Sequence, residues 1–255
     1  MRSLIWISLF VAGLLGVLVP VGYFYVANQL PTLDSELDVE KLLRLDIEGE
    51  RRTEQMGRTE RDPAGQKFER PDFSRLPKDL VAFYISQRGC PTFFQTPREA
   101  GARWVARLVV GLAGKELRGD GFCERLLALR LAERVGARGA LLLTVGANKI
   151  HSVLEKDQLI AYDLSSVWFE PGIIGAEALA RRLFHKELSQ LRLSELAELT
   201  LALPPHGYYA QMRDCQNPSL IRANRDHLLA ELAADDLIPV DRSKSAQAEP
   251  VACAR

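Results

Sequence analysis

The sequence predicts a mainly α-helical protein held in a membrane by one N-terminal transmembrane helix. Three observations support this fold class. The N-terminal segment is apolar and uncharged, and apolar residues recur at helical spacing through much of the remaining chain. Prolines and capping residues stand where those helical patterns begin or end. With 255 residues, the chain has room for an anchor and one domain that buries its own core.

The N-terminal segment has the length and composition of a membrane span. No charged side chain lies between Arg2 and Asp34, and residues 4–26 are almost wholly apolar. About 20 such residues cover the hydrocarbon thickness of a bilayer. A cleaved signal peptide is the alternative, but its apolar stretch is usually about 7 to 15 residues long. We therefore predict a transmembrane anchor over residues 1–28.

The charged residues bear on two questions: whether the protein binds nucleic acid, and how the predicted anchor is oriented in the membrane. The formal net charge is +0, which argues against nucleic acid as the main partner because such binding needs a basic surplus. Arg2 favours a cytoplasmic N-terminus under the positive-inside rule. We therefore expect residues 27–255 on the exported side of the membrane.

Residues 29–75 are expected to form a juxtamembrane linker. This stretch is charged and interrupted by prolines, and residues 49–66 are polar without periodicity. Within it, only residues 37–46 have a pattern that suits a short strand or a short helix. The linker ends where the helical patterns of a single domain begin, and we place that domain at residues 76–238.

The first half of this domain shows apolar residues at helical spacing. Pro77 stands at the start of the first pattern. The expected helices cover residues 80–85, 102–112 and 122–135. Residues 140–145 form a short apolar run that suits either a strand or a buried helix, because its length does not separate the two.

The second half has the stronger helical signal. A helix follows Glu155, and residues 176–184 carry an apolar stripe. Ser194 is expected to cap the next helix, and Asn217-Pro218 to open the last one. Residues 239–255 are expected to be a disordered tail.

The cysteines and histidines show no metal-ligand spacing. The four histidines are scattered, and the four cysteines form no CxxC pair. We therefore expect no cofactor, and nothing in the sequence supports a divalent metal. In an oxidising compartment the cysteines could form one or two disulfides; the alternative is four unrelated small apolar residues.

Residues 155–229 carry a series of short motifs in a fixed order. The motifs are a helix ending in Trp168-Phe169, Pro171-Gly172-Ile173-Ile174-Gly175-Ala176-Glu177-Ala178, Ala180-Arg181-Arg182-Leu183-Phe184-His185-Lys186, Leu193-Ser194-Glu195, Leu203-Pro204-Pro205, and Asn217-Pro218 with Arg222 and Arg225. Together they resemble the C-terminal half of the glycosyltransferase family 51 domain. That domain is the peptidoglycan glycosyltransferase of class A penicillin-binding proteins and monofunctional transglycosylases. The resemblance implies a lysozyme-like fold for the domain.

The upstream half matches this family only in outline. Leu76-Pro77 lies where the family has its opening Leu-Pro. Gln87 occupies the place of the catalytic glutamate in the motif Glu-Asp-x-x-Phe. The second motif, Gly-Gly-Ser-Thr-Ile-Thr-Gln-Gln-Leu, falls on residues 119–127, where the first glycine and the final leucine remain. The third, Arg-Lys-x-x-Glu, falls near residues 139–143 with none of its charges.

These departures bear on the chemistry that the resemblance implies. Family members lengthen glycan chains from a lipid-pyrophosphate-linked disaccharide, using a glutamate that takes a proton from the acceptor 4-hydroxyl. The amide of Gln87 can hydrogen-bond a hydroxyl but cannot accept its proton. Leu143 removes a second carboxylate. The resemblance therefore implies a catalytically degenerate member of the family.

Other residues in the matched motifs have two interpretations. Glu124 and Arg125 could serve as a relocated acid and a phosphate clamp, or form a solvated helix face. Arg181 and Arg182 could contact lipid pyrophosphate or solvate the outer face of their helix. Glu177 matches a recurring glutamate, and we expect it to satisfy backbone donors at the start of its own helix.

The resemblance also suggests a disulfide. Cys90 and Cys123 fall within two motifs that lie close together in the family fold. We hypothesise that they are bonded and that this bond replaces a lost active-site network.

The leading hypothesis is a membrane-anchored, peptidoglycan glycosyltransferase-like protein of cell-wall assembly that binds a lipid-linked glycan or another synthase. It would sit in the bacterial inner membrane with a periplasmic domain. One alternative is an active transferase with rearranged catalytic groups, and its candidate carboxylates are Glu99, Glu124 and Glu133. The other is a structural scaffold protein of the envelope without a ligand.

Overall fold

The structure is a computed structural model that describes residues 21–48, 68, 70–90, 93–95, 98, 122–170, 172–204 and 206–254. The elements are α2 Glu36–Ile47, η1 Phe73–Arg75, α4 Lys78–Ser86, α6 Phe122–Arg134, α7 Ala140–Val153, α8 Lys156–Ser166, β1 Trp168–Glu170, β2 Ile173–Ile174, α9 Gly175–Phe184, η2 Leu188–Gln190, α10 Leu193–Ala202, α11 Tyr209–Arg213, α12 Pro218–Ala234, α13 Val240–Ala248 and η3 Ala252–Ala254. The mainly α-helical fold class is confirmed, and it fits a lysozyme-like domain.

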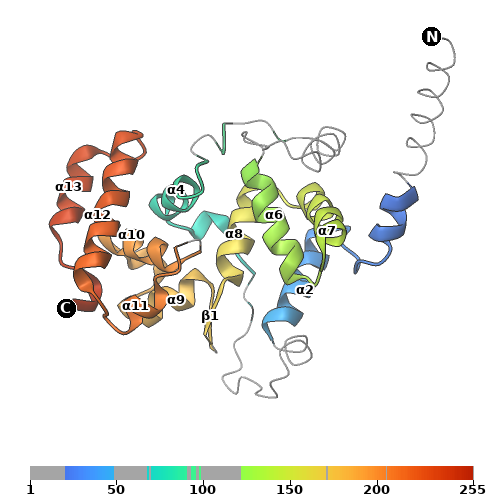
Figure 1. The fold of residues 1–255 in the computed structure, drawn as a ribbon, viewed down its shortest axis with the longest axis horizontal. Coiled ribbons are helices and arrows are strands. Elements are labelled where there is room, and N and C mark those ends of the chain that lie inside the picture. Colours follow the sequence, from blue (N-terminus) through green and yellow to red (C-terminus); the bar gives the residue numbers. More distant parts are fainter. Residues whose placement is uncertain are drawn as a thin grey trace, which may run out of the picture.

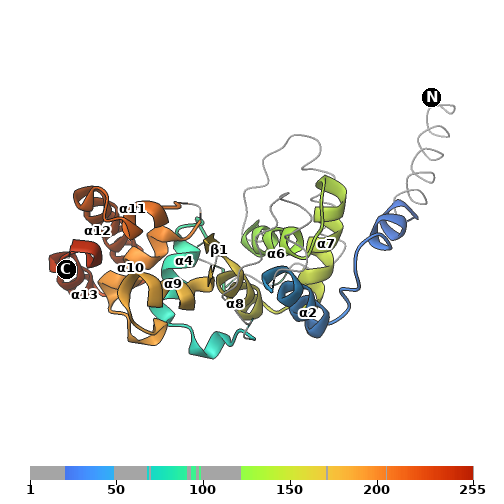
Figure 2. The ribbon, with the colours of Figure 1, turned by 90° about the horizontal axis from the view of Figure 1, so that it is seen from below.

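The helices form two groups with α4 and α8 between them. Helices α2, α6 and α7 lie on one side, and α9 to α13 lie on the other (Figures 1 and 2). Helix α6 packs against both α7 and α8, whereas α4 packs against α10 and α12. Side chains that are far apart in the sequence therefore meet around α4 and α8.

The predicted anchor falls mostly outside the described residues. Residues 21–27 are helical, and the hydroxyl of Tyr23 accepts a hydrogen bond of 2.7 Å from the side chain of Asn148 in α7. In the part of the chain that the structure describes, no helix combines the length and the apolar character needed to cross a bilayer. The anchor over residues 1–28 stays a prediction.

Part of the predicted linker belongs to the folded domain. Residues 37–46, which suited a strand or a helix, lie in α2, whose N-terminus is capped by the Ser35 hydroxyl. Val39 and Leu43 are fully buried. Tyr162 of α8 donates a 3.0 Å hydrogen bond to Glu36. The linker expectation is therefore wrong for α2, because its apolar face is long enough to pack on the domain.

The apolar run at residues 140–145 is helical and opens α7. Gly139 precedes it with a φ of 80°, a conformation that glycine adopts without steric cost. The run was too short to distinguish a strand from a helix, and packing against α6 decides for the helix. The helix expected over residues 102–112 lies outside the described residues.

Two local expectations in the second half are corrected. Helix α8 ends at Ser166, and Trp168 and Phe169 begin an antiparallel hairpin of β1 and β2 rather than ending a helix. The N-cap of α10 is Arg192 instead of Ser194, because Glu195 accepts a hydrogen bond from the Arg192 backbone N–H. The cap of α12 by Asn217, with proline at the first helical position, is confirmed.

The expectation of a disordered C-terminal tail is wrong. Helix α13 packs against α12, and Ser243 donates a buried 2.9 Å hydrogen bond to the Leu229 carbonyl. Val251 is 3% exposed, and a disulfide joins Cys215 to Cys253. The tail lacked a strong apolar stripe because its contacts use small and polar side chains, which helical periodicity does not detect.

A buried ion pair fixes this C-terminal region. The Arg225 guanidinium of α12 lies 3.2 Å from Glu198 of α10 and 2.8 Å from Asp226, and it donates to the Gln247 carbonyl. The other oxygen of Glu198 accepts from the Ala252 N–H at 2.9 Å. We call these residues the Arg225 network; it joins α10, α12, α13 and η3.

Candidate functional site

Gln87 follows the last residue of α4. Its backbone N–H still bonds to the Phe83 carbonyl, so the position of the side chain is set by the end of the helix. Both polar atoms of its side-chain amide are buried, and neither has a hydrogen-bond partner among the residues that the structure describes. Leaving a buried polar group unpaired costs about 1–3 kcal/mol, and such groups are uncommon in folded proteins. A ligand that paired with this amide would remove that cost.

A buried charged cluster adjoins Gln87 through the next residue, Arg88. Asp163 of α8 is fully buried, and Arg130 and Arg134 of α6 each approach its carboxylate to 3.3 Å. Arg88 lies 3.9 Å from the same carboxylate, and the Tyr84 hydroxyl donates a hydrogen bond to it. We call these five residues the Asp163 centre.

The Asp163 centre carries more positive than negative charge. Three guanidinium groups surround one carboxylate, which leaves a formal surplus of two positive charges. Arg88 is 4% exposed and is held by the Tyr84 and Pro204 carbonyls. Burial lowers its pKa, whereas burial and the adjacent Asp163 charge raise the pKa of Tyr84. The arrangement favours an additional anion.

The arginines of α6 keep partial contact with solvent. The side chains of Arg130 and Arg134 are 21% and 17% exposed, whereas that of Asp163 is fully buried. Arg134 also donates to the Asp163 carbonyl at 3.0 Å and to the Ser166 hydroxyl. An anion from solvent could therefore reach these two guanidinium groups without unfolding the site.

Glu124 of α6 forms a second cluster. Its side chain is 3% exposed, with His151 Nε2 at 2.7 Å, Lys156 Nζ at 2.9 Å and Arg98 Nε at 3.9 Å. Burial by itself would raise the pKa of Glu124, but the hydrogen bonds from His151 and Lys156 outweigh it and lower the pKa. Glu124 therefore does not lie on a solvated helix face, and its carboxylate is paired with neighbouring groups.

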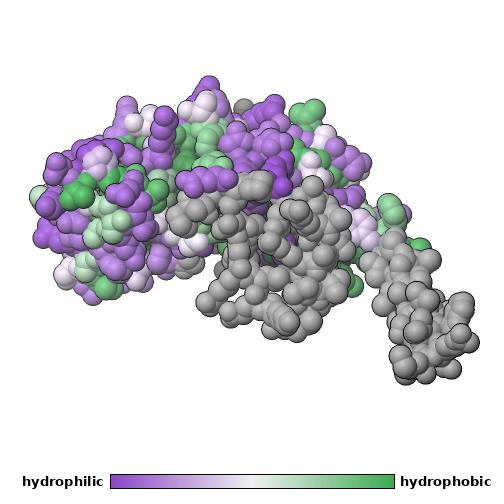
Figure 3. Space-filling view, turned by 90° about the horizontal axis from the view of Figure 1, so that it is seen from above, coloured by the Kyte–Doolittle hydropathy of each residue, from purple (hydrophilic) through white to green (hydrophobic). Residues whose placement is uncertain are grey.

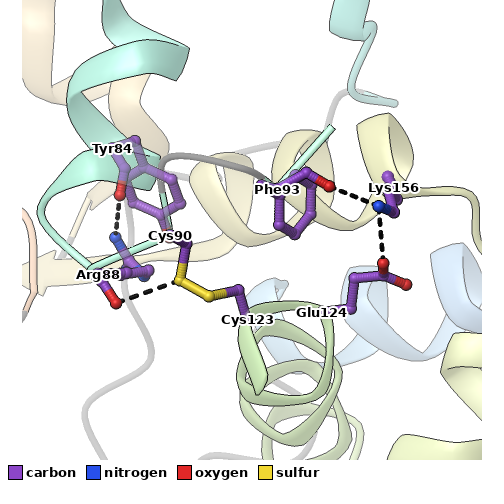
Figure 4. Close-up of a disulfide and its surroundings, with 7 residues drawn as sticks. All are labelled: Tyr84, Arg88, Cys90, Phe93, Cys123, Glu124 and Lys156. Atoms are coloured by element: carbon purple, nitrogen blue, oxygen red, sulfur yellow. Dashed lines mark hydrogen bonds and ion pairs between the residues drawn. A yellow bond between two sulfur atoms is a disulfide. The ribbon is translucent and has the colours of Figure 1, made fainter. Parts of the chain in front are cut away.

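A disulfide lies between the two clusters. Cys90 and Cys123, the pair hypothesised from the sequence, are bonded, with their Cα atoms 6.2 Å apart. Figure 4 shows Arg88 on one side of the bond, and Phe93 with Lys156 on the other. Lys156 donates to the Phe93 carbonyl. The bond therefore ties the segment after α4 to the start of α6, whose arginines complete the Asp163 centre.

The arginines proposed on α9 pair with nearby carboxylates. Arg181 lies 2.8 Å from Glu187 and 3.4 Å from Glu177, and Arg182 lies 3.5 Å from Glu170. Hydrogen bonds from Arg181 and Glu177 lower the pKa of Glu187 to about 2. These exposed pairs are typical of a solvated helix face.

Glu177 does not have its expected role. It accepts a 3.3 Å hydrogen bond from the Leu188 N–H, beyond the C-terminal end of α9. The expectation that it serves donors at its own helix start is wrong, because its side chain lies toward η2.

The remaining candidates are spread along α6 and beyond it. Arg125 is half-buried in α6, and Glu133 is 61% exposed, 3.7 Å from Arg138. Glu99 lies outside the described residues. Within the described ranges, no group of three or more histidine, cysteine, aspartate or glutamate side chains could hold a metal ion.

Sequence reasoning missed the Asp163 centre. Two signals were available: an aspartate between Tyr162 and Leu164 within the apolar side of α8, and arginines four residues apart in α6. A charge within an apolar helix face requires a partner when it is buried. The sequence could not say which arginines would meet it.

Comparison with known proteins gives partial matches to transglycosylases. No family model matches the chain. It is 28% identical to the penicillin-binding protein 1A of Rickettsia felis over 102 residues, which are 40% of this chain and 12% of that protein. It is 29% identical to the biosynthetic peptidoglycan transglycosylase of Ralstonia nicotianae over 86 residues, 34% of this chain and 37% of the relative.

A third relative is more similar over a shorter stretch. The chain is 44% identical over 62 residues to the biosynthetic peptidoglycan transglycosylase of Salmonella typhimurium, 24% of each protein. In all three cases the chain spans well under two thirds of the relative's length. These matches support the family that the sequence motifs resemble, the glycosyltransferase family 51 transglycosylases, as the family of this chain.

Proposed function

We propose that this chain is a membrane-anchored transglycosylase-like protein that binds a lipid-pyrophosphate-linked glycan of cell-wall assembly without polymerising it. The observation that carries this proposal is the Asp163 centre, a buried positive surplus next to Gln87. The site has groups that favour an anion, and it has an amide where the family resemblance implies a glutamate.

The carboxylates of the Asp163 centre and of the Glu124 cluster are poorly suited to general-base work. A general base must be unprotonated yet basic enough to accept a proton near neutral pH. Asp163 faces three guanidinium groups and a tyrosine hydroxyl, and the pKa of Glu124 is lowered. The cationic partners of Glu124 stabilise its charged form and so oppose proton transfer to it, whereas the carboxylate of Asp163 is fully buried among its partners.

The positive surplus suits a pyrophosphate. Arginine can hold two phosphate oxygens at once through its planar guanidinium. Arg130 and Arg134 lie one helical turn apart on α6 and are partly exposed. The buried amide of Gln87 could then hydrogen-bond a sugar hydroxyl of the same ligand.

Two disulfides support the proposed location. Cys90 pairs with Cys123 and Cys215 with Cys253. Disulfides persist in oxidising compartments such as the bacterial periplasm, whereas cytosolic reductants keep thiols reduced. This favours a single-pass inner-membrane protein with its domain exported.

The test uses the full chain extracted in detergent and a lipid-linked disaccharide as ligand. We expect no glycan polymer from the unaltered protein, but measurable binding of the ligand. An Arg130→Gln/Arg134→Gln double variant should bind at least about tenfold more weakly, because charge-assisted hydrogen bonds contribute about 1.5–3 kcal/mol each. The matched control Arg138→Gln removes an exposed arginine beyond the end of α6 and should bind normally.

A Gln87→Glu variant distinguishes two explanations for the absence of polymerisation. Either the cleft is intact and lacks only a general base, or the cleft itself no longer serves the reaction. Polymer from this variant alone would show a cleft that lacks only its base. Polymer from the unaltered protein would overturn the proposal and favour an active transferase. If the double variant binds the ligand as tightly as Arg138→Gln does, the Asp163 centre does not bind the glycan. That result would favour the alternative of a structural scaffold protein.

A further inference from the structure

An apolar pocket of about 340 Å³ lies beside α4. Its walls come from segments that are distant in the sequence: η1, α4, the turn at residues 93–95 and the connection between α12 and α13. The apolar lining residues that matter here are Leu76, Val81, Ala82, Ile85, Phe94 and Leu237. Ligand pockets typically have this size and are mostly apolar with a few polar groups.

The pocket exists because α4 is apolar on two faces. One face packs on the protein core through Leu80 and Phe83, which are fully buried. The other face carries Val81, Ala82 and Ile85 and forms a wall of the pocket. A helix that is apolar all round is normally covered on all sides. Here the second face meets a cavity.

The edge of the pocket is exposed and carries positive charge. Phe94 and Leu237 are 51% and 36% exposed. Figure 3 shows hydrophobic residues among hydrophilic ones over the described part of one face of the molecule. Lys78 also lines the pocket, is exposed, and has no ion-pair partner among the described residues. Its neighbour Asp79 is neutralised by Arg242 at 2.7 Å.

We propose that this pocket takes one acyl chain of an anionic phospholipid, with Lys78 beside the phosphate of the head group. The apolar walls match a hydrocarbon chain, and the unpaired ammonium group matches a negative head group. This site involves other side chains than the Asp163 centre and does not depend on glycan binding.

The experiment places the full chain in phosphatidylcholine nanodiscs that contain phosphatidylglycerol with a photoreactive diazirine in one acyl chain. After irradiation, mass spectrometry locates the adducts. We expect adducts in the peptides that contain residues 73–86 and Leu237. Ala82→Phe, which fills the pocket, should abolish most of them. Lys78→Gln should reduce them by about fivefold, the effect of roughly one surface lysine.

Two controls separate this site from general membrane contact. Lys244→Gln removes an exposed lysine of α13 and should leave the adducts unchanged. A diazirine phosphatidylcholine should label the same peptides about fivefold less than the anionic lipid. Pocket labelling that persists in Ala82→Phe and Lys78→Gln, or that is equal for the neutral lipid, would overturn the proposal. Absence of adducts in the pocket would also overturn the proposal. It would favour an apolar side chain of a partner protein as the occupant of the pocket.

Discussion

Two of the buried charged sites in the described part of this chain, the Arg225 network and the Asp163 centre, differ in how completely their charges are balanced. In the Arg225 network, one guanidinium meets two carboxylates and a carbonyl, and a backbone N–H holds the second oxygen of Glu198. In the Asp163 centre, three guanidinium groups meet one carboxylate, and the amide of Gln87, the residue before Arg88, has no hydrogen-bond partner in the described part of the chain. The central carboxylate of each site is buried, Glu198 at 1% and Asp163 at 0% exposed, so the burial of the carboxylate does not distinguish the two sites.

We infer from this difference that the Arg225 network is structural and that the Asp163 centre is the binding site proposed above. A buried charge without a partner is unfavourable, so a site that serves only stability is expected to be balanced within the protein. The fully buried pair of the Arg225 network, Arg225 and Glu198, meets that condition with the protein's own groups, because the second carboxylate, Asp226, is 31% exposed to solvent. Under the proposed function, the Asp163 centre meets it when an external anion binds. The predictions below test this contrast, beginning with the largest expected effect.

Removing Arg225 should be strongly destabilising. Arg225→Met leaves Glu198 buried without its cation, and breaking a buried pair in this way costs about 3–5 kcal/mol. Denaturant unfolding of the full chain in detergent measures the loss. Arg222→Met, at an exposed position of the same helix, is the matched control and should change stability by about 0.5 kcal/mol or less. Equal effects would show that the network is dispensable.

The two disulfides should contribute similarly to stability but differently to binding. Their cysteines are 33 and 38 residues apart, so each closes a similar loop and should contribute about 3–4 kcal/mol. We expect Cys90→Ser/Cys123→Ser to weaken pyrophosphate binding as well, because that bond positions α6 relative to Arg88.

The other double variant, Cys215→Ser/Cys253→Ser, should leave pyrophosphate affinity unchanged. Calorimetric titration with inorganic pyrophosphate distinguishes the two. Reactive thiols in protein purified without reductant would contradict the pairing itself.

Asp163→Asn should destabilise the fold in a way that added anion reverses. It removes the one negative charge among three arginines, which we expect to cost about 2 kcal/mol because two of them keep some solvent contact. Inorganic pyrophosphate should restore stability to Asp163→Asn by mass action. It should not restore stability to Arg225→Met. Glu231→Gln, which alters an exposed carboxylate of α12, is the control. Failure of pyrophosphate to stabilise Asp163→Asn would argue against an anion site.

Glu195 should make the balanced C-terminal region sensitive to acid. Burial would raise its pKa, but hydrogen bonds from Arg192 and Lys186 outweigh burial and lower the pKa to about 2. A lowered folded-state pKa contributes stability above the ordinary value of 4.5, and this contribution is lost as the pH falls toward 2.

The matching variant is Glu195→Gln. We expect it to lower stability at neutral pH by about 1–2 kcal/mol and to flatten the loss between pH 4.5 and 2. Unfolding free energies measured across that range provide the test. A variant with the same acid profile as the unaltered protein would contradict the assignment.

The sequence alone determined features that depend on neighbouring residues. The position of most helices followed from apolar spacing, and the start of α12 followed from Asn217-Pro218, because the cap and the proline act within one helical turn. The motifs between residues 155 and 229 also indicated the family that the relatives support. In contrast, residues 140–145 stayed ambiguous because a short apolar run suits both kinds of element.

Only the tertiary structure decided which polar residues meet. Asp163 lies 33 residues from Arg130 and 29 from Arg134, and no local pattern encodes that approach. The tail was expected to be disordered because α13 buries Ser243 and Ala246 rather than large apolar side chains. Helical periodicity is a local property, whereas the pairing of buried charges depends on which helices pack together. The surplus charge of the Asp163 centre, to which Arg88 belongs, therefore became apparent only in the folded chain.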